Sequence, residues 1–239
     1  MKISIWKKLI AGMLSILLIY CIAGVWTNQL ITSVVTNDTI PARYTIVVDP
    51  GHGGEDGGAV SCSGAYESQI NLDISLRLRD LLNLMGIPTV LTRDDDYSIY
   101  TTGKTLSEKK VSDLKNRVQI VAELESPLLI SIHQNYFPDG RYSGAQVFYG
   151  KTENSQILAS KLQQAFVSAL NEGSKRMEKP GDNIYLLEKM KCDAILVECG
   201  FLSNLREESL LRKPEYQKKI CCVIAATVSD YSTISPSLS

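Results

Sequence analysis

Short apolar, β-branched runs alternate along the chain with longer segments of helical periodicity, and this alternation constrains the fold more than any other feature. The runs predicted to be strands are Tyr44–Val48, Thr89–Thr92, Leu128–Ile132, Gly144–Tyr149 and Ala194–Val197. The helical stripes are Ile70, Ile74, Leu78, Leu81 and Met85; Val111, Leu114, Val118 and Val121; Leu158, Leu162, Ala165, Phe166 and Ala169; and Ile220, Val223, Ile224, Thr227, Val228 and Tyr231. The pattern predicts a single α/β domain, in which helices flank a mostly parallel, twisted sheet.

The N-terminal end differs from the rest of the chain. Three lysines (Lys2, Lys7 and Lys8) precede the uncharged apolar run Leu9–Trp26, which is typical of an export signal and borders on the length of a spanning helix. Lysines on that side of the run predict that the bulk of the chain lies outside the cytoplasm. The predicted partition is a signal peptide or membrane anchor at 1–26, a polar linker at 27–43, one folded domain at 44–232 and a flexible tail at 233–239.

Charge and cysteine content argue against two classes of protein. The formal net charge of the 239 residues is −1, so the chain has no basic footprint for a nucleic-acid partner. Of six cysteines, only Cys21 falls in the predicted leader, and the odd number that remains does not predict a disulfide framework. The redox state of these cysteines is left open.

Each of three predicted strands is followed by an ionisable side chain. His52 follows the first in "IVVDPGHGG", His133 ends the third in "LLISIHQN", and Glu198 ends the last in "AILVECG". One histidine at a strand end is more often structural than catalytic, but here both histidines of the chain occupy equivalent positions. Because the carboxyl ends of parallel strands share one edge of a sheet, we expect these three side chains to converge there.

Two imidazoles and a carboxylate form the ligand set of hydrolytic zinc sites, which leave a fourth position for water. Two glutamates are candidates for the carboxylate ligand and the general base. Glu67 is at the start of a predicted helix, where an anion is stabilised, whereas Glu198 after an apolar strand would have a raised pKa suited to proton transfer. Spacing alone does not decide between them. The glycines of Gly51–Gly58 match neither GxGxxG nor GxxxxGK[ST], so they do not predict a nucleotide loop.

At these residues the sequence resembles the type 3 family of zinc-dependent N-acetylmuramoyl-L-alanine amidases. The resemblance extends from about Tyr44 to Tyr231 and consists of an ordered set of blocks. These are "VVDPGHGGEDGGA", "YESQINLDISLRLRDLL", "VLTRDDD", "LKNRVQIVAE", "LISIHQN", "SGAQVFY" and "ILVECGFLSN". One block would be a weak signal, but the whole set in family order is highly specific.

The resemblance implies a role for each candidate residue and makes 44–232 a catalytic domain. One zinc ion per chain is held by His52, Glu67 and His133, and Glu198 is the catalytic acid/base. Two further positions match the family, Arg117 and Asn135, and they are expected to support the site or the substrate. The substrate implied is peptidoglycan, cleaved between N-acetylmuramic acid and L-alanine.

Within the family, a leader followed by one bare domain resembles the germination-specific amidases of the spore cortex. That likeness implies an exported protein, anchored or secreted, in the space between the forespore and mother-cell membranes. It also implies a muramic acid deacetylase as functional partner in making muramic δ-lactam, and an accessory protein or lipoprotein as activator. Leader cleavage, the need for a partner, stem-peptide preference and oligomeric state are left open.

Two other functions stay open at this point. A metallocarboxypeptidase-like enzyme would use the same ligand chemistry, and it would need an arginine aimed at a substrate carboxylate, such as Arg93, Arg117 or Arg141. A non-catalytic wall-binding protein would be expected to lack a ligand or the base. All four of those residues are present, which disfavours the second alternative.

Overall fold

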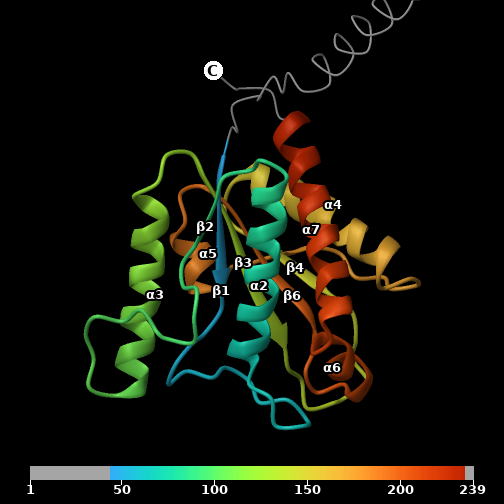
Figure 1. Ribbon diagram of the computed structural model, residues 1–239, viewed down its shortest axis with the longest axis horizontal. Coiled ribbons are helices and arrows are strands. Elements are labelled where there is room, and N and C mark those ends of the chain that lie inside the picture. Colours follow the sequence, from blue (N-terminus) through green and yellow to red (C-terminus); the bar gives the residue numbers. More distant parts are fainter. Residues whose placement is uncertain (1–43, 235–239) are drawn as a thin grey trace, which may run out of the picture. The chain divides into compact units, whose positions relative to one another are not determined.

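Six strands form one mixed sheet in the computed structural model, which describes residues 44–234 (Figure 1). They are β1 (Thr45–Pro50), β2 (Thr89–Leu91), β3 (Pro127–Asn135), β4 (Gln146–Tyr149), β5 (Lys179–Pro180) and β6 (Asp193–Phe201). Their order across the sheet is β2-β1-β3-β6-β4-β5. Four strands are mutually parallel: β1, β2, β3 and β6. Strand β4 pairs antiparallel with β6, and β5 pairs parallel with β4. The predicted α/β fold with a mostly parallel sheet is confirmed. The antiparallel direction of β4 was not predicted.

The helices are α2 (Glu67–Leu84), α3 (Leu106–Ala122), α4 (Glu153–Ala169), α5 (Tyr185–Lys189), α6 (Leu205–Leu211) and α7 (Pro214–Ile234). A capping box fixes where α3 begins. There the Thr105 hydroxyl accepts a hydrogen bond from the Glu108 N–H, and the Glu108 carboxylate accepts one from the Thr105 N–H. β5, α5 and α6 were not predicted, because two, five and seven residues are too few to show a period.

The sheet is covered by helices on both faces, and residues of each strand alternate between the two. Toward α2, α4 and α7 lie Ile46, Val48, Leu128, Ile130, Ile132, Ile195 and Val197, which belong to the larger core. Toward α3 and α5 lie Val47, Leu129, Ala194 and Leu196, which belong to a smaller core. Figure 1 shows α2 and α7 in front of the sheet and α5 behind it.

The face toward α3 and α5 becomes polar near the carboxyl ends of the strands. On β1, β3 and β6 the alternation that buries Val47, Leu129 and Leu196 next places Asp49, Ser131 and Glu198 on the same side. α3 matches this change, since its buried residues are Ser112, Asp113, Arg117 and Val121. The predicted apolar stripe of this helix is therefore wrong at Val111, which is 47% exposed. Polar groups, rather than an apolar contact, hold the first half of α3 against the sheet.

Two of the predicted strands are longer than their apolar runs. β3 continues to Asn135 and β6 to Phe201, and His133 lies opposite Glu198 in the ladder. These two side chains therefore project from within their strands instead of following them. The predicted leader and linker, and positions 235–239 of the predicted tail, lie outside the described residues. Within residues 44–234, no helix has the length and apolar character needed to cross a bilayer.

Candidate metal centre

The carboxylate of Glu67 lies between the two histidines of the chain. Its Oε2 is 3.3 Å from His52 Nε2, and its Oε1 is 3.0 Å from His133 Nδ1. The imidazole centroids are 5.0 Å apart in an edge-to-face arrangement, and one ligand atom from each residue lies within 4.8 Å of the others. Neighbouring ligands of a tetrahedral zinc with bonds of about 2.0–2.1 Å are separated by roughly 3.3 Å, so this spacing suits the ion.

Glu67 is the first residue of α2, and three donors fix its carboxylate. The N–H groups of Ala59 and Gln134 donate to Oε2 and Oε1 at 3.0 and 3.1 Å, and Asn71 Nδ2 donates to Oε1 at 3.2 Å. Burial raises the pKa of Glu67, but the hydrogen bonds from both histidines outweigh burial and lower it below its ordinary value. The group is therefore held as an oriented carboxylate.

Two glycines make room for the cluster. A Cβ on Gly51 would lie 2.2 Å from Cε1 of His133, and one on Gly58 would lie 2.7 Å from both Glu67 Oε2 and His52 Cδ2. His52 itself adopts a left-handed backbone (φ 62°), which costs energy for a residue with a side chain. The turn after β1 is therefore shaped to bring the His52 ring and the Glu67 carboxylate together.

Asp56 sets the orientation of the His52 ring. Its Oδ2 is 2.9 Å from His52 Nδ1, which leaves Nε2 facing Glu67, and its Oδ1 pairs with Lys110 Nζ at 2.7 Å. Burial lowers the pKa of His52, but the hydrogen bonds and charges of Asp56 and Glu67 raise it to about 9. Such an environment favours a cation, and a carboxylate on the outer nitrogen is the usual partner of a metal-binding histidine.

Glu198 lies beside the cluster without joining its hydrogen bonds. Its Oε2 is buried and has no hydrogen-bond partner among the described residues, although an unpaired buried oxygen is costly. Burial raises the pKa of Glu198 to about 7; Glu67 adds to the rise, and the two histidines oppose it. A carboxyl group with a pKa near neutrality and a free oxygen is suited to accept and return a proton.

Two buried arginines hold the main chain that carries His52. Nε and Nη2 of Arg93 donate to the carbonyls of Pro50, His52 and Gly51, at 2.7–3.0 Å. Arg117 donates to the carbonyls of Pro50 and His52 at 2.8 and 2.7 Å. The Arg117 side chain is only 2% exposed and bonds the backbone of the site, and its predicted support role stays a prediction.

Arg117 also pairs with two carboxylates. Its Nη1 is 2.5 Å from Asp49 Oδ1, and its Nε is 2.6 Å from Asp113 Oδ2. Asp49 accepts further hydrogen bonds from the hydroxyls of Thr92 and Ser131, both at 2.6 Å. Burial raises the pKa of Asp49, but Arg117 and these two hydroxyls lower it to about 2. Asp49 is therefore ionised and buried beneath the turn that carries His52.

Sequence reasoning missed the roles of Asp49 and Asp56, and it considered Arg93 only as a possible partner of a substrate carboxylate. Arginine among aspartates in "TRDDD" reads as an exposed run, and the only signal for its role was membership of a family block. The predicted Asn135 is placed at the end of β3, where its carbonyl accepts from the Leu202 N–H at 2.8 Å. That contact fixes its backbone, and the predicted role of its side chain stays a prediction.

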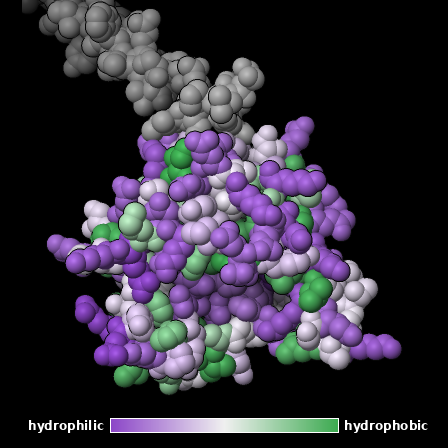
Figure 2. All heavy atoms as spheres, turned by 180° about the vertical axis from the view of Figure 1, so that it is seen from behind, coloured by the Kyte–Doolittle hydropathy of each residue, from purple (hydrophilic) through white to green (hydrophobic). Residues whose placement is uncertain are grey.

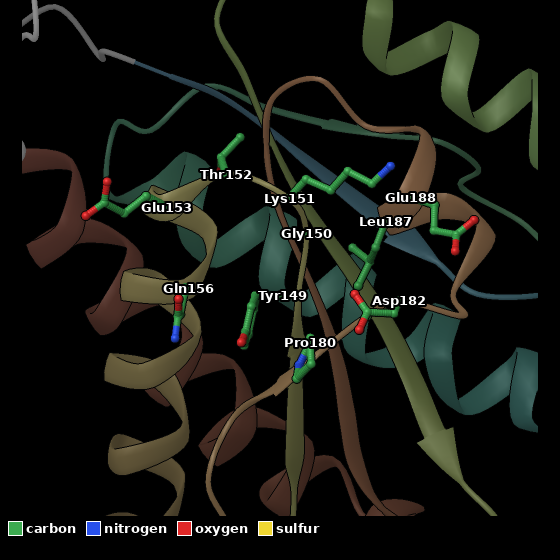
Figure 3. Close-up of a pocket in the computed structure, with 11 residues that line it drawn as sticks. Tyr149, Gly150, Lys151, Thr152, Glu153, Gln156, Pro180, Asp182, Leu187 and Glu188 are labelled. Carbon is green, nitrogen blue, oxygen red and sulfur yellow. The ribbon is translucent and has the colours of Figure 1, made fainter.

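Two cavities lie at opposite edges of the sheet. The one beside the cluster has a volume of about 250 Å³ and includes His52 and His133 in its lining. Seen from behind the view of Figure 1, the lower centre of the molecule has a hollow of hydrophilic residues, with hydrophobic residues at the lower rim on both sides (Figure 2). The other cavity, of about 440 Å³, lies where β4 ends, and Tyr149, Gln156 and Asp182 line it (Figure 3). None of the cluster residues lines that larger cavity, so its size does not make it the reaction site.

The fold and the site together define an α/β enzyme with a candidate metal centre at the carboxyl edge of its parallel strands. The chain belongs to the N-acetylmuramoyl-L-alanine amidase family, whose model matches residues 46–230. It is therefore an amidase that acts on peptidoglycan, as the sequence resemblance predicted.

Three relatives place the chain within this family. It is 38% identical over 190 residues to a germination-specific N-acetylmuramoyl-L-alanine amidase of Bacillus subtilis, covering 79% of each chain. The structure of the CwlD amidase from Clostridioides difficile in complex with the GerS lipoprotein matches with a TM-score of 0.77 and 38% identity, over 80% of this chain and 100% of that one. An N-acetylmuramoyl-L-alanine amidase from Clostridium difficile 630 gives a TM-score of 0.70 at 30% identity, over 81% and 98% of the two chains.

Proposed function

We propose that the chain is a zinc-dependent amidase that removes stem peptides from spore-cortex peptidoglycan. The observation that carries the chemical part is the triad His52–Glu67–His133 with the unpartnered Oε2 of Glu198 beside it. When bound by the triad, zinc supplies Lewis acidity toward the amide carbonyl and the attacking water. The donor set, the spacing of the ligand atoms and the glycine cradle all fit this ion.

The residues of the chain divide the remaining work. Glu198 accepts a proton from the attacking water at Oε2 and passes it to the departing nitrogen of L-alanine, so that the amide carbon–nitrogen bond breaks. Asp56 holds the ring of His52, and Arg93 and Arg117 hold its backbone. The metal ligands are thus oriented before substrate arrives, which reduces the reorganisation needed for reaction.

The biological setting rests on the relatives. One is named germination-specific, which supports a role in the spore cortex for this chain as well. Removal of the stem peptide would free the lactoyl group of muramic acid, and a muramic acid deacetylase would then allow the δ-lactam to form. The solved complex of a relative with the GerS lipoprotein supports an accessory lipoprotein here. An exported protein in the space between the forespore and mother-cell membranes would meet these partners.

The carboxypeptidase alternative needs an arginine that can bind a substrate carboxylate, and the three candidates are already engaged within the protein. Arg93 and Arg117 are buried, and their donors already serve carbonyls and carboxylates of the chain. Arg141 pairs with Asp139 on the surface. No observation favours a second function over the amidase.

The test is hydrolysis of cortex peptidoglycan by the zinc-loaded protein, with products identified by mass spectrometry. Free peptides that begin at L-alanine, together with stripped muramic residues, are expected. Glu198→Gln should abolish turnover while zinc content stays at one per chain, whereas Glu172→Gln, an exposed control, should be fully active. Stem peptides shortened at their C-terminal end, or full activity of Glu198→Gln, would overturn the proposal.

A further inference from the structure

The cavity of about 250 Å³ begins directly at the metal cluster and extends between α3 and α5. Gly51, His52 and His133 are among the residues that line it. Leu196 of β6, on the face of the sheet toward α3 and α5, lines it too. Pockets that hold drug-sized ligands are typically about 300–1,000 Å³, so this smaller cavity suits a short peptide segment rather than a run of sugars.

One part of the cavity wall is apolar. Leu114 of α3, Ile184 and Leu186 at α5, and Leu196 contribute side chains to it. An aliphatic wall of this kind offers contact to small apolar groups such as the methyl of alanine. It offers few hydrogen-bond partners to the many hydroxyl groups of a glycan strand.

The charged part of the wall holds two cations, Arg117 and Lys110, and three carboxylates, Asp49, Asp56 and Asp113. The guanidinium of Arg117 is 2% exposed and bonds Asp49 and Asp113, so it is used within the protein. The Lys110 side chain is 44% exposed, and its ammonium group pairs with Asp56 Oδ1 at 2.7 Å. An ammonium group has three donors, so Lys110 can bind a second carboxylate while it keeps Asp56.

We propose that this cavity binds the first residues of the stem peptide, and that Lys110 selects a carboxylate on the residue after L-alanine. The inference rests on the proposed reaction at the cluster, because that reaction fixes L-alanine next to His52 and His133. The apolar wall then receives the alanine methyl, and the next residue, a D-glutamyl group or its amide, reaches Lys110. The free α-carboxylate of that residue would pair with the ammonium group, whereas a carboxamide would not.

Two synthetic N-acetylmuramoyl tripeptides that differ only in this group, carboxylate or carboxamide, test the inference on the full-length zinc-loaded protein. Lys110→Met should raise KM for the carboxylate substrate about tenfold, as expected for one charge-assisted hydrogen bond, and change KM for the carboxamide less than about twofold. Lys110→Arg should restore most of the preference. Lys115→Met, on the exposed side of the same helix, is the matched control and should behave as wild type.

The comparison of two substrates separates recognition from effects that Lys110 could exert through Asp56 and His52. A change of zinc affinity would alter both substrates equally, and zinc content is measured alongside. Equal losses on the two substrates, or no loss, would overturn the role of Lys110 while leaving the amidase reaction standing. If the wild type cleaves neither substrate, the proposed function fails. Calorimetric binding of the free tripeptides to wild type and Lys110→Met then decides the subsite: charge-dependent binding supports it, and equal binding overturns it.

Discussion

Replacement of Arg117 by methionine tests whether the buried charges beneath the metal site form one coupled unit. The substitution keeps most of the side-chain length but leaves the Asp49 carboxylate, 1% exposed, with only the hydroxyls of Thr92 and Ser131. Breaking a buried ion pair in this way typically costs about 3–5 kcal/mol. We therefore expect the free energy of unfolding to fall by about 4 kcal/mol.

The partner variant Asp49→Asn should cost less, because Arg117 keeps Asp113. The pKa of Asp49 is lowered from 3.8 to about 2, which corresponds to roughly 2 kcal/mol of stabilisation of the ionised form. In the double variant, position 49 carries no unpaired buried charge. Its cost should then be near 4 kcal/mol rather than the sum of about 6, a coupling of about 2 kcal/mol.

Urea unfolding followed by far-UV circular dichroism measures these differences. The exposed pair Arg141–Asp139 gives a control, and Arg141→Met should leave the unfolding midpoint unchanged. Strictly additive costs for the two single variants would show that Arg117 and Asp49 act independently, and would refute the reasoning.

Three further predictions concern the same part of the molecule. Gly51→Ala should place a methyl 2.2 Å from the His133 ring and reduce bound zinc, measured by metal analysis, well below one per chain. Asp56→Asn should weaken zinc binding about 10- to 100-fold in a chelator competition, because the ring of His52 loses its orienting carboxylate; unchanged affinity would contradict that role. The pKa of Asp49 is lower in the folded than in the unfolded state, so its stabilisation is present above about pH 4 and lost as the pH falls toward 2. The wild type should therefore lose more stability than Asp49→Asn across that range in acid titrations followed by circular dichroism.

Periodicity in the sequence was sufficient to predict most of the architecture. The apolar runs that contain Val48, Ile130 and Val197 became neighbouring parallel strands, and the shared carboxyl edge brought His52 and His133 to either side of Glu67. This worked because buried strands carry a strong apolar signal and parallel connections leave little freedom in topology. Periodicity did not decide between Glu67 and Glu198, because local spacing does not indicate which carboxylate lies between the two imidazoles.

Other features carry no local signal. The run Gly144–Tyr149 is apolar in either direction, so its antiparallel pairing with β6 depends on the path of the chain before it. Val111 fits a helical stripe but is exposed, because polar groups such as Arg117 occupy the buried side of α3. Arg93 was hidden for a related reason: burial of an arginine depends on carbonyl groups from a turn some 40 residues earlier in the chain.

The two-residue alternation along β1, β3 and β6 has a consequence for how this enzyme tolerates mutation. Positions such as Val48, Ile130 and Val197 face the larger core, so substitutions there should lower the amount of folded protein. The positions that directly follow them, Asp49, Ser131 and Glu198, lie on the opposite face of the sheet, at its polar end near the candidate site. A deep mutational scan that reads abundance and turnover separately should therefore show two interleaved patterns on each strand, offset by one residue. Variants that retain abundance but lose turnover would then map the active face of the sheet without any ligand.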